Sequence, residues 1–369
     1  MGAFNGALST LWLLFIVFFT LPQNTFGKNK TCAFKGRAKP GDQYWLETIE
    51  KRGSAPYSPN PGNYTVFRNV KDYGAKGDGL TDDTAAIQRA ISDGGRCGEG
   101  CPGSTVTPAL VYFPSGTYLI SRPVVAYYYT SMVGNPRSLP TLLASKDFQH
   151  FNGTLGVIDA DPYLPGGINW YTNQNNFFRS VRNFVIDLRE VPANATVNGM
   201  HWQVSQATSL TNVRFEMSQV PGNNHQGLFL ENGSGGFMSD LHFRGGRYGM
   251  IVGNQQFTVR NVTVENVQTG IMQIWNWAWT FQDVKIINCE VGFNLTTALA
   301  GTGSELIVDV EVINTPIFLA TSGTSPAITN VTTTSNMTII LDNVKLENVT
   351  TGVIDGNGTV LLEGGKTKM

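Results

Sequence analysis

The sequence predicts an all-β protein: a right-handed parallel β-helix, or solenoid, with an N-terminal helical cap. The first observation is a repeat in which one Asn or Asp is followed by alternating apolar and polar residues, the periodicity of a β-strand. A repeat of 21 to 34 residues with several short strands is typical of stacked coils. The repeated anchor residues are Asn183, Asn212, Asp240, Asn261, Asp283, Asp309 and Asn343.

A glycine at a fixed place in the repeat is the second observation. In four repeats it lies nine residues after the anchor, and in two longer repeats it precedes the same kind of short apolar strand. A recurrent glycine indicates either a positive φ or a close approach between backbones, and the anchor side chains are expected to form a ladder. A β-sandwich, the alternative fold, does not predict this constant offset. The glycines are Gly199, Gly227, Gly249, Gly270, Gly292 and Gly352.

The segment GDGLTDDTAAIQRAI, residues 77–91, predicts a cap that closes the first coil. Thr81 is the expected N-cap of a short helix, with Asp82 and Asp83 in its first turn, where the helix dipole favours acidic residues. The sequence DGG after Ser92 is expected to end the helix. Its apolar stripe consists of Ala86, Ile87, Ala90 and Ile91.

Residues 1–27 are expected to be a signal peptide, because the apolar run Leu11–Leu21 is too short to span a bilayer about 30 Å thick. An uncleaved anchor is the alternative. Residues 28–66 would be an N-terminal extended segment and residues 67–369 the β-helix domain. The protein is thus predicted to be secreted and extracellular, with no membrane association after cleavage. The net charge of −1 argues against a nucleic-acid partner.

Eleven Asn-x-Ser/Thr sequons support the prediction of an exported glycoprotein. Four cysteines permit three pairings. We expect Cys97 and Cys101 to form a disulfide that closes CGEGC, which leaves Cys32 and Cys289 available for a second bridge. The cysteine spacing suits no zinc site, and no cofactor is expected. The sequons begin at Asn29, Asn63, Asn152, Asn194, Asn232, Asn261, Asn294, Asn330, Asn336, Asn348 and Asn357.

Two stretches, VKDYGAKGDGLTDDTAAIQRAI (70–91) and ALVYFPSGTYLIS (109–121), resemble the N-terminal signature of the pectate-lyase-like β-helix superfamily, which indicates fold but not reaction. Three further stretches, YWLETIEKRGSAPYSPNPGNYTVFRNVKDYGA, GMHWQVSQATSLTNVRFEM and LENGSGGFMSDLHFRGGRYGM, resemble fungal family 55 glycoside hydrolases, the exo-acting 1,3-β-glucanases. The resemblance runs from about residue 43 to the C-terminus. It implies a secreted, inverting, exo-type hydrolase that releases glucose from 1,3-β-glucan.

The resemblance also implies where the catalytic groups lie. Members of family 55 carry two tandem β-helices with the general acid on the second, and only the first is expected here. The positions that match the water-holding residues are Gln206 in WQVSQAT and Ser234 in NGSGGF, 28 residues apart and close to the local repeat. Neither can supply a proton. The rival interpretation is a catalytically incomplete glucan-binding or assembly module, whose partner is a second β-helix domain or chain.

Aromatic and polar residues provide candidate substrate contacts. Trp275, Trp277 and Trp279 alternate in QIWNWAWTF, which would place them on one face of a strand. Sugar contact, packing against a second domain and core filling are all compatible with that face. Glu231 follows the strand GLFL and is also compatible with a solvated strand residue. The remaining candidates for contact with the polysaccharide are Trp202 in GMHWQV and His225 on an insertion.

A pectin-type lyase or hydrolase is the third interpretation, because Asp159, Asp161 and Asp187 suggest the Ca²⁺ carboxylates of such a lyase. Asp159 and Asp161 lie in the loop IDADPYLPGG, however, and are more typical of turn residues. No arginine base accompanies them. His201 lies on a separate repeat without the spacing of a metal ligand.

Overall fold

The computed structural model describes residues 42–151, 153–296, 302–322 and 338–368, and residues 44–369 form one compact unit. Several predictions lie outside the described residues. They are the signal peptide 1–27, the first part of the extended segment, Cys32, and the sequons at Asn29, Asn152, Asn330 and Asn336.

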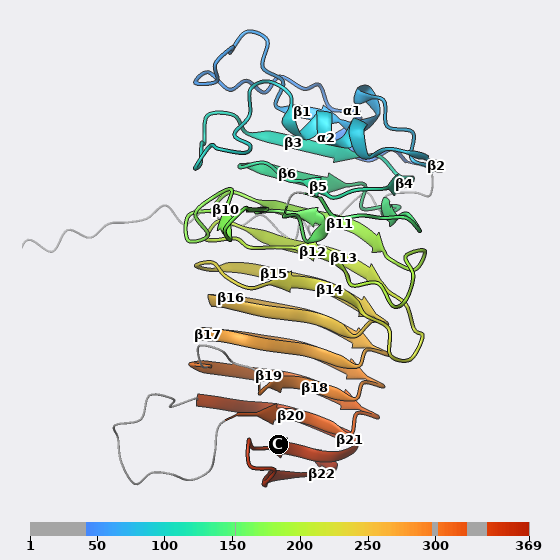
Figure 1. Ribbon diagram of the computed structural model, residues 1–369, viewed down its shortest axis with the longest axis vertical. Coiled ribbons are helices and arrows are strands. Elements are labelled where there is room, and N and C mark those ends of the chain that lie inside the picture. Colours follow the sequence, from blue (N-terminus) through green and yellow to red (C-terminus); the bar gives the residue numbers. More distant parts are fainter. Residues whose placement is uncertain (1–41, 152, 297–301, 323–337, 369) are drawn as a thin grey trace, which may run out of the picture. The chain divides into compact units, whose positions relative to one another are not determined.

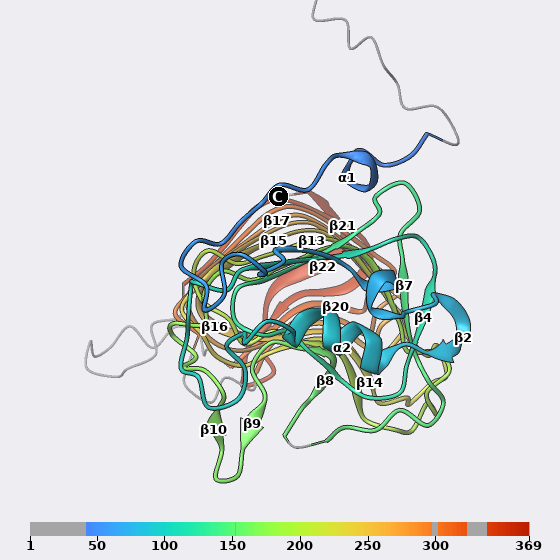
Figure 2. The same cartoon turned by 90° about the horizontal axis from the view of Figure 1, so that it is seen from above.

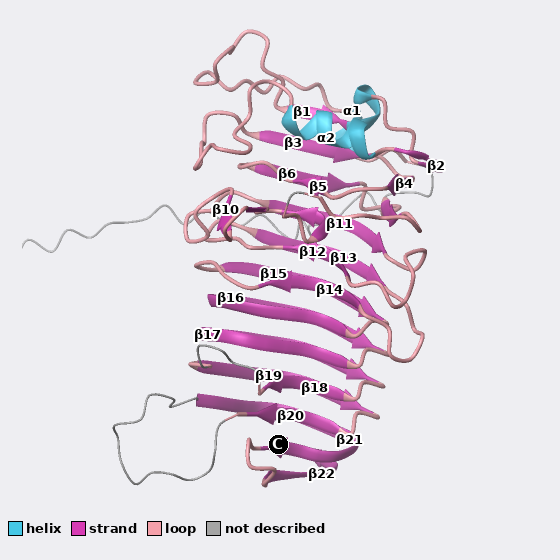
Figure 3. Ribbon diagram, in the orientation of Figure 1, coloured by secondary structure: helices cyan, strands magenta, loops and turns pink. Residues whose placement is uncertain are grey.

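Strands dominate the described chain, and its few helices lie toward its N-terminal end (Figure 3), so the all-β prediction is confirmed. The helices are α1 (Trp45–Thr48), the 3₁₀ helix η1 (Val70–Tyr73) and α2 (Thr84–Ser92). The strands are β1 (Phe67–Asn69), β2 (Asp78–Asp82), β3 (Ala109–Phe113), β4 (Thr117–Ile120), β5 (Val124–Val125), β6 (Thr130–Gly134), β7 (Thr141–Ala144), β8 (Gly156–Asp159), β9 (Tyr163–Leu164), β10 (Ile168–Asn169), β11 (Ser180–Asp187), β12 (Val197–His201), β13 (Ser209–Glu216), β14 (His225–Leu230), β15 (Gly236–Arg244), β16 (Tyr248–Glu265), β17 (Thr269–Ile287), β18 (Val291–Leu295), β19 (Ser304–Ile313), β20 (Ile317–Thr321), β21 (Thr338–Ile354) and β22 (Val360–Lys368).

The strands stack in successive coils, and most of them pair in parallel with their equivalents in neighbouring coils (Figure 1). The exceptions are the antiparallel pairs β9–β10 and β21–β22. β11 shows how a coil turns a corner: Ser180–Arg182 pairs with β6, whereas Val185–Asp187 pairs with β7. The anchor Asn183 lies between these segments with φ 65°. The other six anchors also have positive φ, from 51° to 57°. Asn and Asp tolerate this left-handed conformation better than most residues, so each anchor bends the chain between two strands.

The predicted ladder of anchor side chains is confirmed. The Nδ2 of Asn212 donates to Asn183 Oδ1 at 3.0 Å, and the Nδ2 of Asn261 donates to Asp240 Oδ1 at 2.6 Å. A second ladder, which we did not predict, lies five residues further along four coils, where each asparagine again has a positive φ. Its amides are linked at 3.2, 3.0 and 2.9 Å. This second ladder comprises Asn266, Asn288, Asn314 and Asn348.

The repeated glycines lie where the backbones of successive coils come closest. A Cβ on Gly249 would lie 2.6 Å from the carbonyl oxygen of Gly270, and one on Gly270 would lie 2.8 Å from that of Gly292. None of the six glycines has a positive φ. Close approach, rather than the left-handed conformation, is therefore the reason for glycine at this position.

Helix α2 covers the end of the first coils (Figure 2), and its apolar stripe is buried there, as predicted. The predicted start of the helix is wrong. Thr81 lies in β2, where its backbone N–H and hydroxyl both donate to Asp78. Asp82 and Asp83 precede the helix: Asp82 accepts from the N–H of Thr84 at 3.0 Å, and Asp83 accepts from the N–H groups of residues 76 and 77. Asp83 thus ties the helix to the preceding loop.

One acidic residue, Glu305 of β19, is buried inside the coils with 0% exposure. Its Oε1 accepts from the Nδ2 of Asn276 at 2.5 Å, while its Oε2 has no hydrogen-bond partner among the described residues. Burial raises the pKa of this carboxyl well above 4.5, against the opposing effect of the hydrogen bond. Burial therefore favours the neutral form of the Glu305 carboxyl.

Replacing Glu305 by glutamine is expected to raise the free energy of unfolding at pH 8 by more than about 1.4 kcal/mol, the value of one pKa unit. The stability that the protonated acid contributes is full below pH 4.5 and is lost as the pH rises through the raised folded pKa. Glutamine does not ionise. Thermal unfolding from pH 4 to pH 9 checks this, with exposed Glu290→Gln as control. Parallel pH profiles of wild type and Glu305→Gln would contradict it.

Candidate active site

The candidate site lies where β8, β12 and β14 end, three strands that pair side by side on successive coils. From each of them the chain turns toward the next strand. We call these three turns, residues 160–179, 202–208 and 231–235, the site edge. The parallel bridge between Val204 and Gly233 holds the last two turns in register. The site edge therefore brings together residues that are one repeat apart in sequence.

Gln206 and Ser234 are in contact on the site edge. The Oγ of Ser234 lies 2.7 Å from Gln206 Oε1 and 2.9 Å from the carbonyl oxygen of Gln174. Gln206 is exposed, whereas Ser234 is only 4% exposed. Gly233 allows this approach, because a Cβ there would overlap the carbonyl of Val204. The side chains thus stack as their spacing of 28 residues predicted.

A buried charged network, which the sequence did not reveal, lies beside this pair. The imidazole of His201 is held between two carboxylates, with Nδ1 2.9 Å from Asp159 Oδ1 and Nε2 2.9 Å from Glu231 Oε1. Asp159 and His201 side chains are 0% exposed, and that of Glu231 is 16% exposed. Each residue ends or follows an equivalent strand: β8, β12 or β14.

The charges in this network shift the pKa values of His201 and Glu231. Burial would lower the pKa of His201, but the charges of Asp159 and Glu231 outweigh it and raise that pKa well above 6.5. Burial would likewise raise the pKa of Glu231, yet the imidazolium and the hydrogen bonds lower it below 4.5. Near neutral pH these shifts favour a His201 imidazolium that is hydrogen-bonded to the Glu231 carboxylate. A clue was present in the sequence, since His201 and Glu231 are 30 residues apart, close to the local repeat.

Tyr163 of β9 covers the network. Its hydroxyl donates to Glu231 Oε1, and its ring stacks on the His201 ring with centroids 5.9 Å apart. The imidazole also stacks on Phe229, with ring centroids 5.7 Å apart. The indole N–H of Trp275 donates to the backbone carbonyl of Glu231 at 2.6 Å. The carboxylate of Glu231 is thus engaged by the protein itself, which leaves little of it for the predicted contact with a sugar.

Two predicted substrate contacts are contradicted by burial. Trp202 is 0% exposed and packs in the core. His225 is also 0% exposed: its Nδ1 accepts from the N–H of Ser218 at 3.2 Å, and its Nε2 lies 3.1 Å from the carbonyl of Pro192. The insertion that precedes β14 covers this histidine instead of presenting it.

The three neighbouring tryptophans do not share one face. Trp279 is 1% exposed in the core, whereas Trp277 is 63% exposed and Trp275 is half-buried. The pairing of β16 with β17 changes register between Val252 and Gly253, because β17 has one additional residue there. This additional residue is Ile274, which precedes all three tryptophans and does not separate them. The alternation fails later, because the consecutive residues Trp277 and Ala278 are both exposed and Trp279 is buried. Trp277 is thus the indole that remains available to a ligand.

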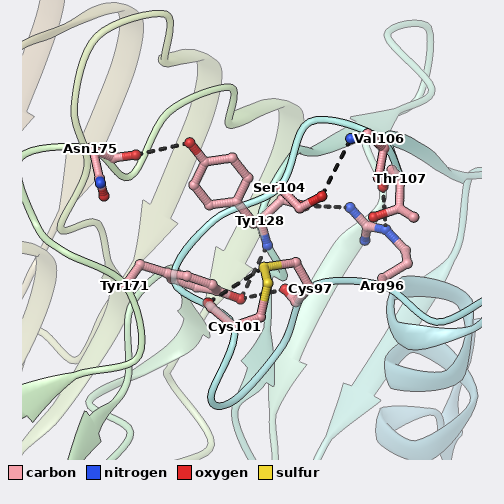
Figure 4. The surroundings of a disulfide bond; sticks show 9 residues. All are labelled: Arg96, Cys97, Cys101, Ser104, Val106, Thr107, Tyr128, Tyr171 and Asn175. Carbon is pink, nitrogen blue, oxygen red and sulfur yellow. Dashed lines mark hydrogen bonds between the residues drawn. A yellow bond between two sulfur atoms is a disulfide. The ribbon is translucent and has the colours of Figure 1, made fainter. Parts of the chain in front are cut away.

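The predicted disulfide between Cys97 and Cys101 is confirmed, with Cα atoms 5.3 Å apart. Figure 4 shows it beside Tyr171, whose hydroxyl donates to the carbonyl of Cys97 at 2.8 Å. The second bridge is not tested, because Cys32 lies outside the described residues; among those residues Cys289 is a free thiol that is 3% exposed. Burial raises its pKa to about 11.

The aspartates considered for a calcium site do not converge. Asp159 binds His201, and Asp187 pairs with the guanidinium of Arg189 at 2.6 Å. Asp161 is buried, and its Oδ1 accepts from the N–H of Tyr171. Burial raises the pKa of Asp161 to about 8. Within the described ranges no group of three or more acidic, histidine or cysteine side chains has the arrangement of a metal site.

Seven sequons lie in described residues. Asn63, Asn194 and Asn357 are exposed. Asn261 and Asn348 are exposed too, but their Nδ2 atoms donate within the two ladders. The two half-buried sequon residues are Asn232 and Asn294.

Parallel strands stacked coil on coil, with a polar edge at their C-terminal ends, define the pectate-lyase-like class of proteins. A family model described as "Rhamnogalacturonase A/epimerase, pectate lyase-like" matches residues 67–294, and the chain belongs to this family. The predicted superfamily is thereby confirmed.

Curated proteins with similar sequences indicate a more specific group within this family. The chain is 48% identical over 326 residues to a probable glucan endo-1,3-beta-glucosidase of Arthroderma benhamiae, covering 87% of this chain and 36% of the relative. It is 44% identical over 354 residues to a glucan 1,3-beta-glucosidase of Cochliobolus carbonum, covering 93% and 43%. It is also 46% identical over 330 residues to the non-secreted LysM effector LysM15 of Penicillium expansum, covering 87% and 22%. The chain thus spans less than half of each relative, and the predicted resemblance to 1,3-β-glucanases is confirmed. The described part of the chain contains no helix long and apolar enough to cross a membrane.

Proposed function

We propose that this chain forms the water-holding half of a secreted, inverting, exo-acting 1,3-β-glucan hydrolase, built on a right-handed parallel β-helix. The right-handed sense follows from the general rule that about 98% of crossovers between parallel strands are right-handed. The single observation that carries the function is the contact between Gln206 and Ser234 on the site edge. Similarity to proteins named as 1,3-β-glucosidases supports the substrate class.

The hydrogen bonds of the pair suit it to holding a water molecule. The hydroxyl of Ser234 has one proton, so it cannot donate both to Gln174 and to Gln206. If Ser234 donates to the Gln174 carbonyl, the Gln206 amide nitrogen donates to Ser234 Oγ, and Gln206 Oε1 turns to solvent. This exposed oxygen then accepts a hydrogen bond from the attacking water.

Glu231, the acidic residue on the same short turn as Ser234, is not suited to supply the proton for the leaving oxygen. Hydrolysis of a glycosidic bond ordinarily needs a carboxylic acid for this step. Glu231, three residues before Ser234, is an anion near neutral pH because His201 lowers its pKa. We therefore assign the general acid to a second β-helix domain or chain that faces the site edge.

The surface beside the pair suits a neutral polysaccharide. A shallow groove continues from Gln206 across the following coils and is lined by uncharged residues. Hydroxyl and amide groups of this kind form hydrogen bonds with sugar hydroxyls without a net charge. The groove residues include Thr208, Phe237, Gln256, Thr258 and Thr280.

Export and glycosylation belong to the same proposal. The leader at residues 1–27 and the eleven sequons support a secreted glycoprotein. Among the described sequons we expect Asn63, Asn194 and Asn357 to carry glycans, because they are exposed and lie outside the asparagine ladders.

Purified chain is expected to bind a linear 1,3-β-glucan hexasaccharide, and Gln206→Ala is expected to weaken that binding about tenfold, or about 1.4 kcal/mol. Isothermal titration calorimetry measures it, with exposed Glu190→Gln as a control on another turn. Glucose release is expected only when the acid-bearing partner is added.

Other results would favour the rival functions. Retained binding without hydrolysis in the presence of that partner would indicate a glucan-binding or assembly module. Calcium-dependent release of unsaturated products from polygalacturonate would indicate a pectin-type lyase. A folded chain that binds no 1,3-β-glucan would contradict the proposal.

A further inference from the structure

The first turn of the site edge is much longer than the two that follow it. Residues 160–179 separate β8 from β11, whereas residues 202–208 and 231–235 form short turns on the next two coils. The long turn contains the antiparallel pair β9 and β10, which projects outward from the stacked coils (Figure 2). One end of the site edge therefore carries a projecting segment, which we call the end segment, residues 160–179.

The end segment lies against the short turns and directly contacts the water-holding pair. The carbonyl of Gln174 accepts from Ser234 Oγ at 2.9 Å, and that of Asn173 accepts from Ser205 Oγ at 2.5 Å. Tyr163 reaches Glu231, on the same short turn as Ser234. On the opposite side of the pair, the uncharged groove continues across the following coils. The groove begins at Gln206, whose partner Ser234 contacts the end segment, so a linear chain that extends past Gln206 toward the preceding coil would meet the end segment.

Glu231 holds the end segment through its hydrogen bond with Tyr163. Its ionised carboxylate accepts hydrogen bonds from Tyr163 and from the His201 imidazolium, which is itself held by Asp159. Charge-assisted hydrogen bonds of this kind are shorter and stronger than neutral ones. The stacking of Tyr163 on His201 fixes the orientation of the ring.

Hydrogen bonds near the disulfide also hold the end segment in place. Tyr171 donates to the carbonyl of Cys97 at 2.8 Å, and the hydroxyl of Tyr128 donates to the carbonyl of Asn175 at 2.9 Å (Figure 4). Tyr171 is 1% exposed and packs with Cys97 and Tyr128. The end segment is thereby attached on two sides, which suits a fixed boundary rather than a mobile loop.

We propose that the end segment is the wall that closes one end of the glucan groove, and that Glu231, acting through Tyr163, is the positioning residue that fixes this wall. The site then accepts the terminus of a glucan chain instead of its middle. This inference rests on the proposed function and identifies which part of the chain determines the exo mode.

The test compares binding of three probes by isothermal titration calorimetry: an untagged linear 1,3-β-glucan hexasaccharide, and the same hexasaccharide with a bulky aromatic tag at its reducing or its non-reducing end. The wild-type chain is expected to bind one tagged form at least tenfold more weakly than the untagged form, and to tolerate the other tag. Tyr163→Phe, which removes only the hydroxyl, and Glu231→Gln are expected to reduce this discrimination to less than threefold. Exposed Glu190→Gln should discriminate like the wild type.

The possible outcomes distinguish a failure of the proposed wall from a failure of the proposed glucan-binding function. Equal binding of both tagged forms by the wild type, or full discrimination by Tyr163→Phe and Glu231→Gln variants that unfold cooperatively, would show that the end segment does not limit the groove. The glucan-binding function would then stand without the wall. Failure of a cooperatively folded wild type to bind any of the three probes would overturn the proposed function, and the wall with it.

Discussion

Asp159→Ala is expected to lower the free energy of unfolding by about 3–5 kcal/mol, the usual cost of removing one partner from a buried ion pair. Asp159 and His201 are both 0% exposed and lie 2.9 Å apart, so the alanine leaves the imidazolium with one carboxylate in a site that water does not reach. Chemical denaturation at pH 6 measures the loss. The variant also tests whether the site edge depends on this network, since His201 connects it to Glu231.

The pH dependence gives this prediction a second test. The pKa of His201 is raised, so the stability contributed by its charge is fully present below pH 6.5 and is lost as the pH rises through the folded pKa. The effect of Asp159→Ala should therefore be largest near pH 6 and should shrink at strongly alkaline pH. As a control, Asp147→Ala removes a carboxylate whose pair with Lys146 is largely in solvent, and it should cost less than about 1 kcal/mol. Equal losses for the two alanine variants would show that burial does not strengthen the network.

Gly249→Ala is expected to lower the free energy of unfolding by about 3 kcal/mol, the upper part of the range for overpacking. The added Cβ would lie 2.6 Å from the backbone carbonyl of Gly270. That carbonyl belongs to a strand paired in parallel with its neighbours on both sides, so it cannot move without disturbing their hydrogen bonds. The thermal midpoint and the denaturation free energy both report the change.

A matched glycine is available as the control for this variant. Gly62 has no atom within 4 Å of its added Cβ and no positive φ, and Gly62→Ala should leave the stability within about 0.5 kcal/mol of the wild type. A loss at Gly249 no larger than the loss at Gly62 would mean that the coils separate easily at this point. The role assigned to the recurrent glycine would then be wrong.

Much of the fold could be predicted because equivalent positions of the repeat become spatial neighbours. Asn212 and Asn183 are one repeat apart in sequence and are hydrogen-bonded in space. The same rule placed Gln206 beside Ser234. The disulfide of Cys97 and Cys101 could be predicted for a different reason, since a separation of four residues already brings two cysteines close. Regular stacking and short sequence separation are both visible in a sequence.

The parts that could not be predicted depend on departures from the repeat. Two consecutive exposed residues in β17, Trp277 and Ala278, interrupt the alternation and give Trp277 and Trp279 opposite environments. The side chain of Asp78 accepts hydrogen bonds from Thr81 within β2, and the helix begins only at Thr84. Each departure is small in sequence, yet it reverses the environment of a side chain because strands alternate their faces.

The sequence by itself determined that the chain forms stacked parallel coils with an Asn/Asp corner, a closely packed glycine and an apolar cap, because these depend on residue types at repeated positions. Only the tertiary structure determined the buried network of Asp159, His201 and Glu231. Its residues belong to equivalent strand ends, but their burial depends on Tyr163, which lies in a turn much longer than the corresponding turns after β12 and β14. Periodicity specifies which residues stack, whereas the burial and charge of a stacked residue depend on what covers it.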